Sequence, residues 1–264
     1  MGDERWIYAF GGGSAEGGRS MKALLGNKGA GLAEMSNLGL PVPPGFTITT
    51  AACTSFFQNE EQWPAGLEEE LQEALVQLEK RVGRRLGSRR HPLLVSVRSG
   101  SAVSMPGMMD TVLNLGLNDA TVKGLAERSG NPWFAWDSYR RFVQMFGDVV
   151  LGIHYTRFAR EEASFRAEHR VEELGVEELA QLIQRLKRVV ADSGRPFPED
   201  PLEQLRLATN AVFNSFHTHR ARYYRKTQGI PDDAGTAVSI QAMVFGNMGE
   251  ASGTGVAFTR NPKS

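Results

Sequence analysis

Hydrophobic residues form two kinds of pattern along this chain. Short apolar runs rich in β-branched or aromatic residues predict strands at residues 6–10, 46–49, 93–97 and 236–245. Between these runs, leucine and valine recur every three or four positions, most clearly over residues 67–82, which predicts an amphipathic helix. Strands separated by helices indicate an α/β or α+β unit.

The middle of the chain has only the helical period. Between residues 118 and 202, the aromatic residues of 134–146 and an apolar stripe over 179–189 are spaced to bury one helix face each. We therefore expect an all-helical insert there. One long helix, from Leu202 to about Lys226, should then return the chain to the strand-containing unit.

The strand predicted at 93–97 ends where Arg98 appears, and small residues follow it. Ser99-Gly100-Ser101 and Pro106-Gly107 provide turns and free backbone N–H groups, which a loop needs in order to approach a polyanion closely. Arginine presents a rigid fork of donors that fits phosphate oxygens. The pattern is equally consistent with an arginine that pairs with a surface carboxylate, so the residues alone leave both interpretations open.

Lys28 is predicted at the N-terminal end of a helix that runs through Ala30 to Leu38 and stops before Pro41. The helix dipole disfavours a cation at that end. The conflict disappears if the lysine and the first helical N–H groups converge on one phosphate. From this residue alone, a solvated lysine remains the simpler interpretation.

The strand predicted at 236–245 leads into a second loop of small residues. Ser252-Gly253-Thr254-Gly255 offers consecutive N–H groups and two hydroxyls, which suit a phosphate. Backbone amides along Gln241 to Val244 are placed to pair with the edge of an adenine while the loop covers the phosphates.

A glycine-rich segment also follows the first strand. Gly13-x-x-x-x-Gly18-Arg19-Ser20 differs from a P-loop by one substitution. Arg19 replaces the lysine, and the first half of the chain has no apolar strand that ends in Asp to hold magnesium. We therefore interpret the segment as a glycine-rich loop.

Composition argues against several classes of protein. The 264 residues contain 30 basic and 30 acidic side chains, and zero net charge argues against binding to nucleic acid or to anionic membranes. No apolar run approaches the roughly 20 residues of a spanning helix, and the N-terminus lacks a signal-peptide pattern, so we expect a cytoplasmic protein. The single cysteine, Cys53, cannot form an internal disulfide or a Cys-based zinc site.

Three ordered segments carry a resemblance to a known family. They read LLGNKGAGLAEMSNLGLPVPPGFTITTAAC, SVRSGSAVSMPGMMDTVLNLGLND and IQAMVFGNMGEASGTGVAFTRNP. Each is similar to the ATP-binding domain of pyruvate, phosphate dikinase, and the resemblance covers essentially the whole chain. It implies an α+β fold of the ATP-grasp class with an inserted all-helical subdomain.

The same resemblance implies the domain boundaries. Residues 1–117 would form the first ATP-grasp subdomain, to which residues 203–247 return, and residues 118–202 would form the helical insert. Residues 248–264 would begin the second ATP-grasp subdomain, so we expect the chain to be truncated at its C-terminal side and inactive by itself.

Roles of individual residues also follow from the resemblance. Lys28 and Arg98 are the expected catalytic residues, which neutralise charge on the ATP triphosphate during transfer. Loops over the nucleotide and the strand along its base supply the other expected ATP-binding residues, which are Gly107, Thr254, Gly255, Gln241, Met243 and Val244. No metal ligand is assigned within this chain, because Mg²⁺ is expected to bind acidic residues downstream of it.

The implied reaction converts ATP, phosphate and pyruvate into AMP, pyrophosphate and phosphoenolpyruvate through a phosphorylated histidine. The histidine and the pyruvate site would lie on downstream domains of the same parent chain, and we expect the parent enzyme to be a homodimer. Two alternatives remain open. One is an ATP-grasp domain like that of phosphoenolpyruvate synthase, and the other is a nucleotide-binding module without turnover.

Overall fold

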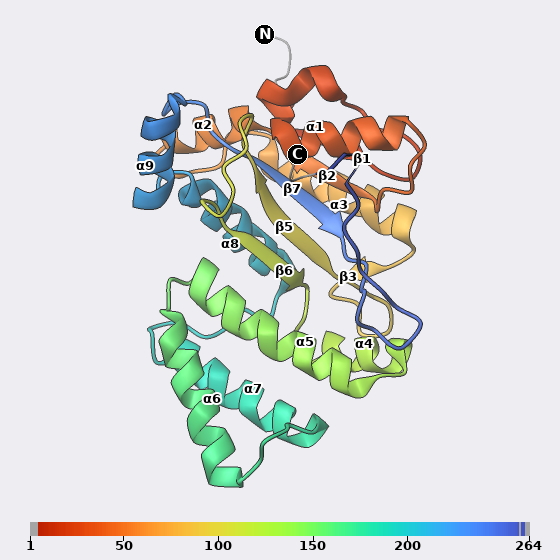
Figure 1. The fold of residues 1–264 in the computed structure, drawn as a ribbon, viewed down its shortest axis with the longest axis vertical. Helices are drawn as coiled ribbons and strands as arrows, with labels where there is room; N and C mark the ends of the chain where they lie inside the picture. The colour runs from red at the N-terminus through yellow and green to blue at the C-terminus, as the bar shows by residue number, and fades with distance from the viewer. Residues whose placement is uncertain (1–4, 259, 262–264) are drawn as a thin grey trace.

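The computed structural model describes residues 5–258, 260 and 261 (Figure 1). Its centre is an antiparallel five-stranded sheet with the strand order β1-β2-β7-β5-β6. The strands are β1 Ile7–Phe10, β2 Gly45–Ile48, β5 Val95–Gly100, β6 Thr111–Leu115 and β7 Ala237–Ala242. A separate parallel pair joins β3 Arg85–Leu86 to β4 Pro92–Leu93. The prediction of a mixed α+β fold is confirmed.

The two central strands present apolar side chains on one face of the sheet and polar ones on the other. In β5, Ser96 and Arg98 alternate with valines, and in β7, Ser239 and Gln241 alternate with apolar residues. The register pairs Arg98 with Ser239 and Ser96 with Gln241. Because side chains two residues apart share a face, these four polar residues lie together on one side of the sheet.

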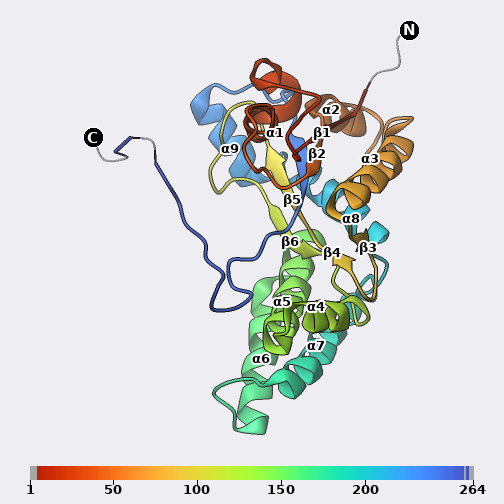
Figure 2. The same ribbon diagram turned by 90° about the vertical axis from the view of Figure 1, so that its right-hand side faces the viewer.

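The apolar face is covered by three helices that form the main core. They are α2 Thr50–Gln58, α3 Leu67–Val82 and α8 Pro201–Ser215. Helix α3 packs on β1 and β2, α2 packs on β7, and α8 packs on β5, β6 and β7 (Figure 2). Buried leucine and phenylalanine side chains of these helices pack with the valines of the sheet; they are Phe56, Leu67, Leu71, Leu78, Leu205 and Phe213. The helix predicted over 67–82 is therefore confirmed, with its apolar stripe inward.

The polar face is covered by α1 Lys22–Asn37, which follows a short 3₁₀ turn, η1 Arg19–Met21. Gly26 divides α1 with φ +67° and ψ 168°, outside the helical region. A Cβ atom at this position would lie 1.7 Å from the carbonyl oxygen of Gly100, so both the conformation and the close contact require glycine. Helical residues begin at Lys22, earlier than expected, but Gly26 separates them from a second helical segment that begins just before Lys28. The predicted helix start near Lys28 is confirmed for this second segment.

The segment between β1 and η1 is a loop, as predicted. The side chain of Asn37, at the end of α1, accepts a hydrogen bond from the backbone of Ala15 (2.8 Å) and donates one to the carbonyl of Gly17 (2.9 Å). The glycine-rich segment is thus held against α1 and does not enclose a phosphate in the manner of a P-loop.

The prediction that residues 118–202 form helices is confirmed. It consists of α4 Thr121–Ser129, α5 Pro132–Met145, a π-helical turn η2 Phe146–Val150, α6 Tyr155–His169 and α7 Val176–Ala191. These helices occupy the lower part of Figure 1, and α5 packs directly on β6. One hydrophobic cluster runs without interruption from Val97 in the sheet to Phe142 and Leu186 in these helices. That they form a separate subdomain therefore stays a prediction.

The prediction of one long helix from Leu202 to Lys226 is wrong. The chain forms α8 and a second helix, α9 His219–Gln228, with a turn between them. Thr218 caps α9 by accepting a backbone N–H of its first turn, and the fully buried Arg225 donates to the carbonyl of Phe216 in the turn. These two side chains satisfy backbone groups that a continuous helix would have used, so the break is stabilised.

Two strand ends also differ from the prediction. Arg98 lies within β5, which continues to Gly100 because the ladder pairs Gly100 with Ala237 of β7. Strand β7 ends at Ala242, before the predicted end at Phe245. Within the described residues, no helix combines the length and apolarity needed to cross a bilayer.

The contact between α1 and β5 leads to a stability prediction. Gly26→Ala should lower the free energy of unfolding by about 2–4 kcal/mol, because it imposes a disfavoured backbone conformation and a clash with Gly100. Gly31→Ala is the matched control on the same helix: a Cβ there meets nothing within 4 Å, and alanine should add about 0.5–1 kcal/mol of stability. Urea unfolding measures both, and an unchanged midpoint for Gly26→Ala would contradict the contact.

Candidate functional site

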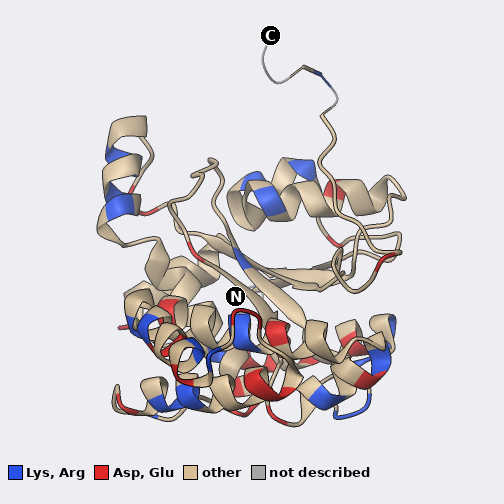
Figure 3. Ribbon diagram, turned by 60° about the horizontal axis from the view of Figure 1, so that its bottom comes forward, with Lys and Arg blue, Asp and Glu red and all other residues tan. Residues whose placement is uncertain are grey.

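The structure brings Lys28 and Arg98 together between α1 and β5. Lys28 lies in the first turn after the kink in α1, and its Nζ donates to the backbone oxygen of Ser99 at 2.8 Å. Arg98 carries the one charge among the residues of the five-stranded sheet. Figure 3 shows that most of the charged residues lie on the helices around the sheet. In the described part of the chain, no carboxylate forms an ion pair with either cation. The interpretation of Arg98 as the partner of a surface carboxylate is therefore wrong for these residues.

Both cations are partly withdrawn from water. Burial lowers the pKa of Lys28, and the positive charge of Arg98 lowers it further. Burial also lowers the pKa of Arg98, and its Nε is a buried donor that has no hydrogen-bond partner among the described groups. An unpaired buried donor and two adjacent like charges are each unfavourable. An anion placed here would relieve both costs.

Gln241 holds Arg98 from the neighbouring strand. The Nη2 of Arg98 donates to Oε1 of Gln241, and Nε2 of Gln241 donates to the backbone oxygen of Pro43 at 2.9 Å. The Gln241 side chain is buried. In each strand, polar residues alternate with apolar ones, and this pattern in the sequence indicates a polar face that includes Arg98 and Gln241. The pairing of the two strands, which brings Arg98 to Gln241, cannot be predicted from the same pattern.

A cavity of about 230 Å³ opens beside these groups. Its walls include Lys28, Ser99, Gly100, Ser101, Gly107 and Thr111. Arg98 itself does not line the cavity, but its neighbour Ser99 and its strand partner Thr111 both do. The walls are formed largely by small residues and hydroxyls, which lets a phosphate approach the backbone.

The loop between β5 and β6 forms the mouth of this cavity. The backbone N–H of Asn27 donates to the carbonyl of Ser101 at 2.9 Å, which ties the start of the loop to α1. At its other end, Asp110 pairs with Arg220 of α9. Between these anchors, Gly107 has φ +70° and is exposed, and a Cβ there would meet no atom within 4 Å. Because Gly107 lines the cavity and has no side chain, its backbone can approach a ligand bound there.

Two residues expected at the adenine lie just beyond the end of β7. The N–H of Met243 already donates to the carbonyl of Leu94 (2.9 Å), and Met243 packs on the main core. Val244 follows with 75% of its surface exposed. In this structure the N–H of Met243 is thus already bonded, whereas Val244 is accessible, and the place of both residues beside the adenine stays a prediction.

Thr254 and Gly255 are not brought to the other site residues. Both are exposed in an extended segment that leaves the body of the molecule (Figure 2). Thr259 and residues 262–264, which belong to the same expected second subdomain, lie outside the described residues.

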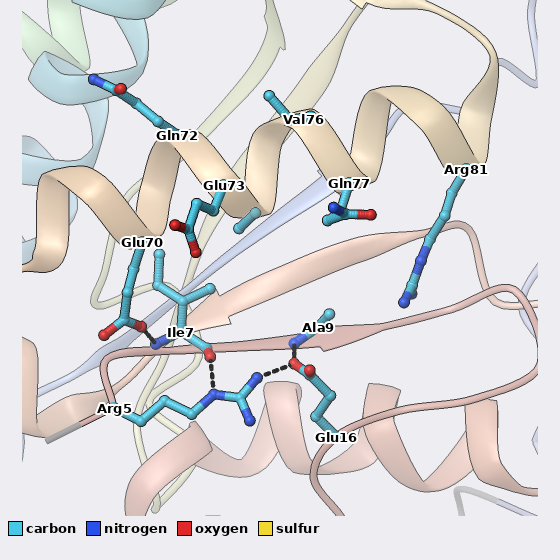
Figure 4. Close-up of a pocket in the computed structure, with 11 residues that line it drawn as sticks. Arg5, Ile7, Ala9, Glu16, Glu70, Gln72, Glu73, Val76, Gln77 and Arg81 are labelled. Carbon is cyan, nitrogen blue, oxygen red and sulfur yellow. Dashed lines mark hydrogen bonds and ion pairs between the residues drawn. The ribbon is translucent and has the colours of Figure 1, made fainter. Parts of the chain in front are cut away.

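A larger hollow of about 630 Å³ lies elsewhere, between β1 and α3 (Figure 4). Three of its charged side chains are bonded to the backbone of β1, the edge strand of the sheet, or of the residue before it. Glu70 accepts from the N–H groups of Trp6 and Ile7, and Glu16 accepts from that of Ala9. Arg5 donates to the carbonyl of Ile7. Because these side chains satisfy the free edge of the sheet, we interpret the hollow as structural.

Comparison with known proteins identifies similar sequences along nearly the whole chain. The family described as pyruvate phosphate dikinase, AMP/ATP-binding domain, matches residues 22–63 and 59–264. The chain is 52% identical to the pyruvate, phosphate dikinase of Rhizobium meliloti, 53% to the chloroplastic one of Flaveria trinervia and 48% to that of Clostridium symbiosum. Each comparison covers 98% of this chain but 29%, 27% and 30% of the respective relative. The chain thus spans less than a third of their length.

The pairing of Lys28 with Arg98 predicts a measurable titration. Removing the like charge by Arg98→Met should raise the pKa of Lys28 toward its ordinary value of 10.5, and so should saturating pyrophosphate. Because the folded state lowers this pKa, it disfavours the protonated lysine at neutral pH. That cost should diminish as the pH rises through the lowered pKa toward 10.5.

Titration of the Lys28 side chain by NMR measures the effect. Arg188→Met, which changes an exposed arginine on α7, is the control and should leave the pKa of Lys28 unchanged. An unchanged titration in Arg98→Met would show that the two cations do not interact.

Proposed function

This chain belongs to the pyruvate phosphate dikinase family through its AMP/ATP-binding domain, and on that premise we propose that the cavity between α1 and β5 binds the triphosphate of ATP. Lys28 and Arg98 would contact the phosphates and neutralise charge that develops as a phosphoryl group is transferred. The loop that carries Gly107 would close the mouth of the cavity over them.

The observation that carries this proposal is the pair of half-buried cations without carboxylate partners in the described structure. Proteins usually pair buried charges, since an isolated one costs several kcal/mol of desolvation. A site that leaves both Lys28 and Arg98 unpaired is stable chiefly when a polyanion completes it. The triphosphate has the charge and the size for that position.

For the parent protein, we propose the reaction named by its relatives. ATP, phosphate and pyruvate would be converted into AMP, pyrophosphate and phosphoenolpyruvate, through a phosphorylated histidine on a downstream domain of the same chain. A pyruvate-binding domain would also lie downstream, and we propose a cytoplasmic homodimer on the same resemblance. The three relatives above carry the dikinase name, which favours this reaction over the synthase-like alternative and over a module without turnover.

We also propose an ATP-grasp arrangement in which a second half of the clamp closes on the nucleotide. Met243 and Val244 would line the adenine from the end of β7. Thr254 and Gly255, exposed here, would belong to the loop that covers the phosphates once the second half is in place. The extended course of this segment leaves room for such a closure (Figure 2).

Magnesium does not fit the residues present. Among the described residues, no three His, Cys, Asp or Glu side chains lie close enough together to hold a metal ion. Lys28, Arg98 and the small residues of the cavity offer no carboxylate ligand. We therefore propose that Mg²⁺, which phosphoryl transfer requires, is bound by carboxylates elsewhere in the parent chain.

The central test is removal of each cation in the complete enzyme. Arg98→Ala and Lys28→Ala should each lower the rate of the ATP half-reaction by roughly 10²- to 10³-fold, because each removes a charge aimed at the transferring group. Arg188→Ala and Lys123→Ala remove exposed cations from the helical region and serve as controls. Rapid-quench measurement of AMP formation decides; wild-type rates in folded Arg98→Ala and Lys28→Ala enzymes would reject the site.

The 264-residue chain by itself should bind MgATP weakly and release no AMP. It supplies one wall of the proposed clamp, and each absent charge-assisted contact removes about 1.5–3 kcal/mol of binding free energy. Calorimetry with MgATP, together with an AMP assay, tests this expectation. Tight binding with turnover would mean that the catalytic groups already lie within these residues.

A further inference from the structure

The side chain of Gln241 is fixed at both of its polar ends. Oε1 accepts from Nη2 of Arg98, while Nε2 donates to the backbone oxygen of Pro43 at 2.9 Å. Arginine can only donate and a proline carbonyl can only accept, so the amide has one orientation that satisfies both. Only 7% of the surface of Gln241 is exposed, so a buried side chain connects Arg98 by hydrogen bonds to the turn that precedes β2.

The family resemblance implied a different role, in which backbone amides along Gln241 to Val244 meet the adenine. The side chain of Gln241 is instead bonded at both of its ends to other groups of the protein, one of which is Arg98. The strand register explains the contact: Ser96 is opposite Gln241, and Arg98 lies two residues further along the same face of β5. Such diagonal neighbours are within reach of a long side chain.

A glutamine here has one property that a glutamate would lack. A carboxylate could also accept from the guanidinium, but it would have no donor for the Pro43 carbonyl and would neutralise the charge of Arg98 in a half-buried site. The amide oxygen accepts a hydrogen bond and leaves the positive charge in place. Lys28 is held in the same manner, since its Nζ donates to the neutral carbonyl of Ser99.

The anchor also opposes a repulsion. Lys28 and Arg98 are close enough for the arginine to lower the pKa of the lysine, so each charge pushes the other away. Without a fixed acceptor, the guanidinium would gain by turning toward water. Gln241 holds it in place, with Nε left without a partner among the described groups.

We propose that Gln241 is a positioning residue for Arg98: it holds the guanidinium in the orientation that leaves its charge and its Nε donor for the phosphates of ATP. This inference rests on the proposed function, because it assigns Gln241 a part in the same phosphate site. It also makes Gln241 a determinant of phosphate binding and not of base recognition.

The sharpest test adds a negative charge to the residue with almost no change in its size, at the loss of the donor to Pro43. In the complete enzyme, Gln241→Glu should raise the KM for ATP by about 10- to 100-fold, because the new carboxylate pairs with Arg98 and repels the triphosphate. Gln241→Met, which removes the acceptor but adds no charge, should raise it by about 3- to 10-fold. Gln181→Glu, at an exposed glutamine on α7, is the matched control and should leave the KM as it is.

Base selectivity separates positioning from a contact with adenine. The ratio of kcat/KM for ATP to that for GTP should be the same in Gln241→Met as in the wild-type enzyme, because the residue does not touch the base. A double-mutant cycle adds a second criterion: once Arg98 is alanine, Gln241→Met should cost little more. A changed ATP-to-GTP ratio, or fully additive losses, would overturn the proposal.

The outcomes also distinguish this inference from the proposed function. A wild-type rate of AMP formation together with a wild-type KM for ATP in Arg98→Ala would reject the phosphate site and with it any role of Gln241 there. Loss of binding in Arg98→Ala together with a wild-type KM in Gln241→Glu would reject the positioning role alone. If Gln241→Glu fails to fold, which circular dichroism would reveal, the Gln241→Met cycle and the base-selectivity ratio still decide.

Discussion

The carbonyl oxygen of Gly100 occupies the space that a side chain at residue 26 would fill, 1.7 Å from the position of a Cβ atom. This contact lets the first residues after the kink in α1 lie directly on the end of β5. Gly29 continues the close approach, since a Cβ there would lie 2.9 Å from the side chain of Thr47. As a result Lys28 reaches the backbone of Ser99 and stands beside the arginine of the same strand. The site is therefore a product of backbone packing between a helix and a sheet.

The two cations at this contact are held by neutral oxygens. Ser99 provides a carbonyl for Lys28, and Gln241 provides an amide for Arg98. Carboxylates would have stabilised the empty site more, since buried charges are normally paired. The neutral acceptors fix geometry while the charge remains available, and the lowered pKa of Lys28 reports the resulting cost. The apolar face of the same sheet, packed on α2, α3 and α8, supplies the stability that offsets this cost.

The helices of residues 118–202 are linked to the site through the chain that leaves β7. Phe245 packs edge-to-face on Phe134 of α5, with ring centroids 5.1 Å apart. The side chain of Asn131 donates to the carbonyl of Met248 at 3.1 Å. These contacts direct the chain away from the sheet before Thr254, at the point where we propose that the second half of the clamp begins. The helical region thus supports the connection between the two proposed halves.

The sequence by itself determined the local elements and the chemistry. Short apolar runs rich in β-branched or aromatic residues predicted the strands. A period of three to four residues predicted the helix over 67–82 and the helices of 118–202, because burial of one helix face imposes that period. The residue types at Lys28 and Arg98 were compatible with a phosphate site but left other interpretations open, and the resemblance to the family selected phosphate. Only the tertiary structure decided that Arg98 lies inside a strand and that Gln241 on another strand holds it. Strand pairing and helix docking join residues far apart in the sequence, and neither leaves a local pattern from which the partner can be read.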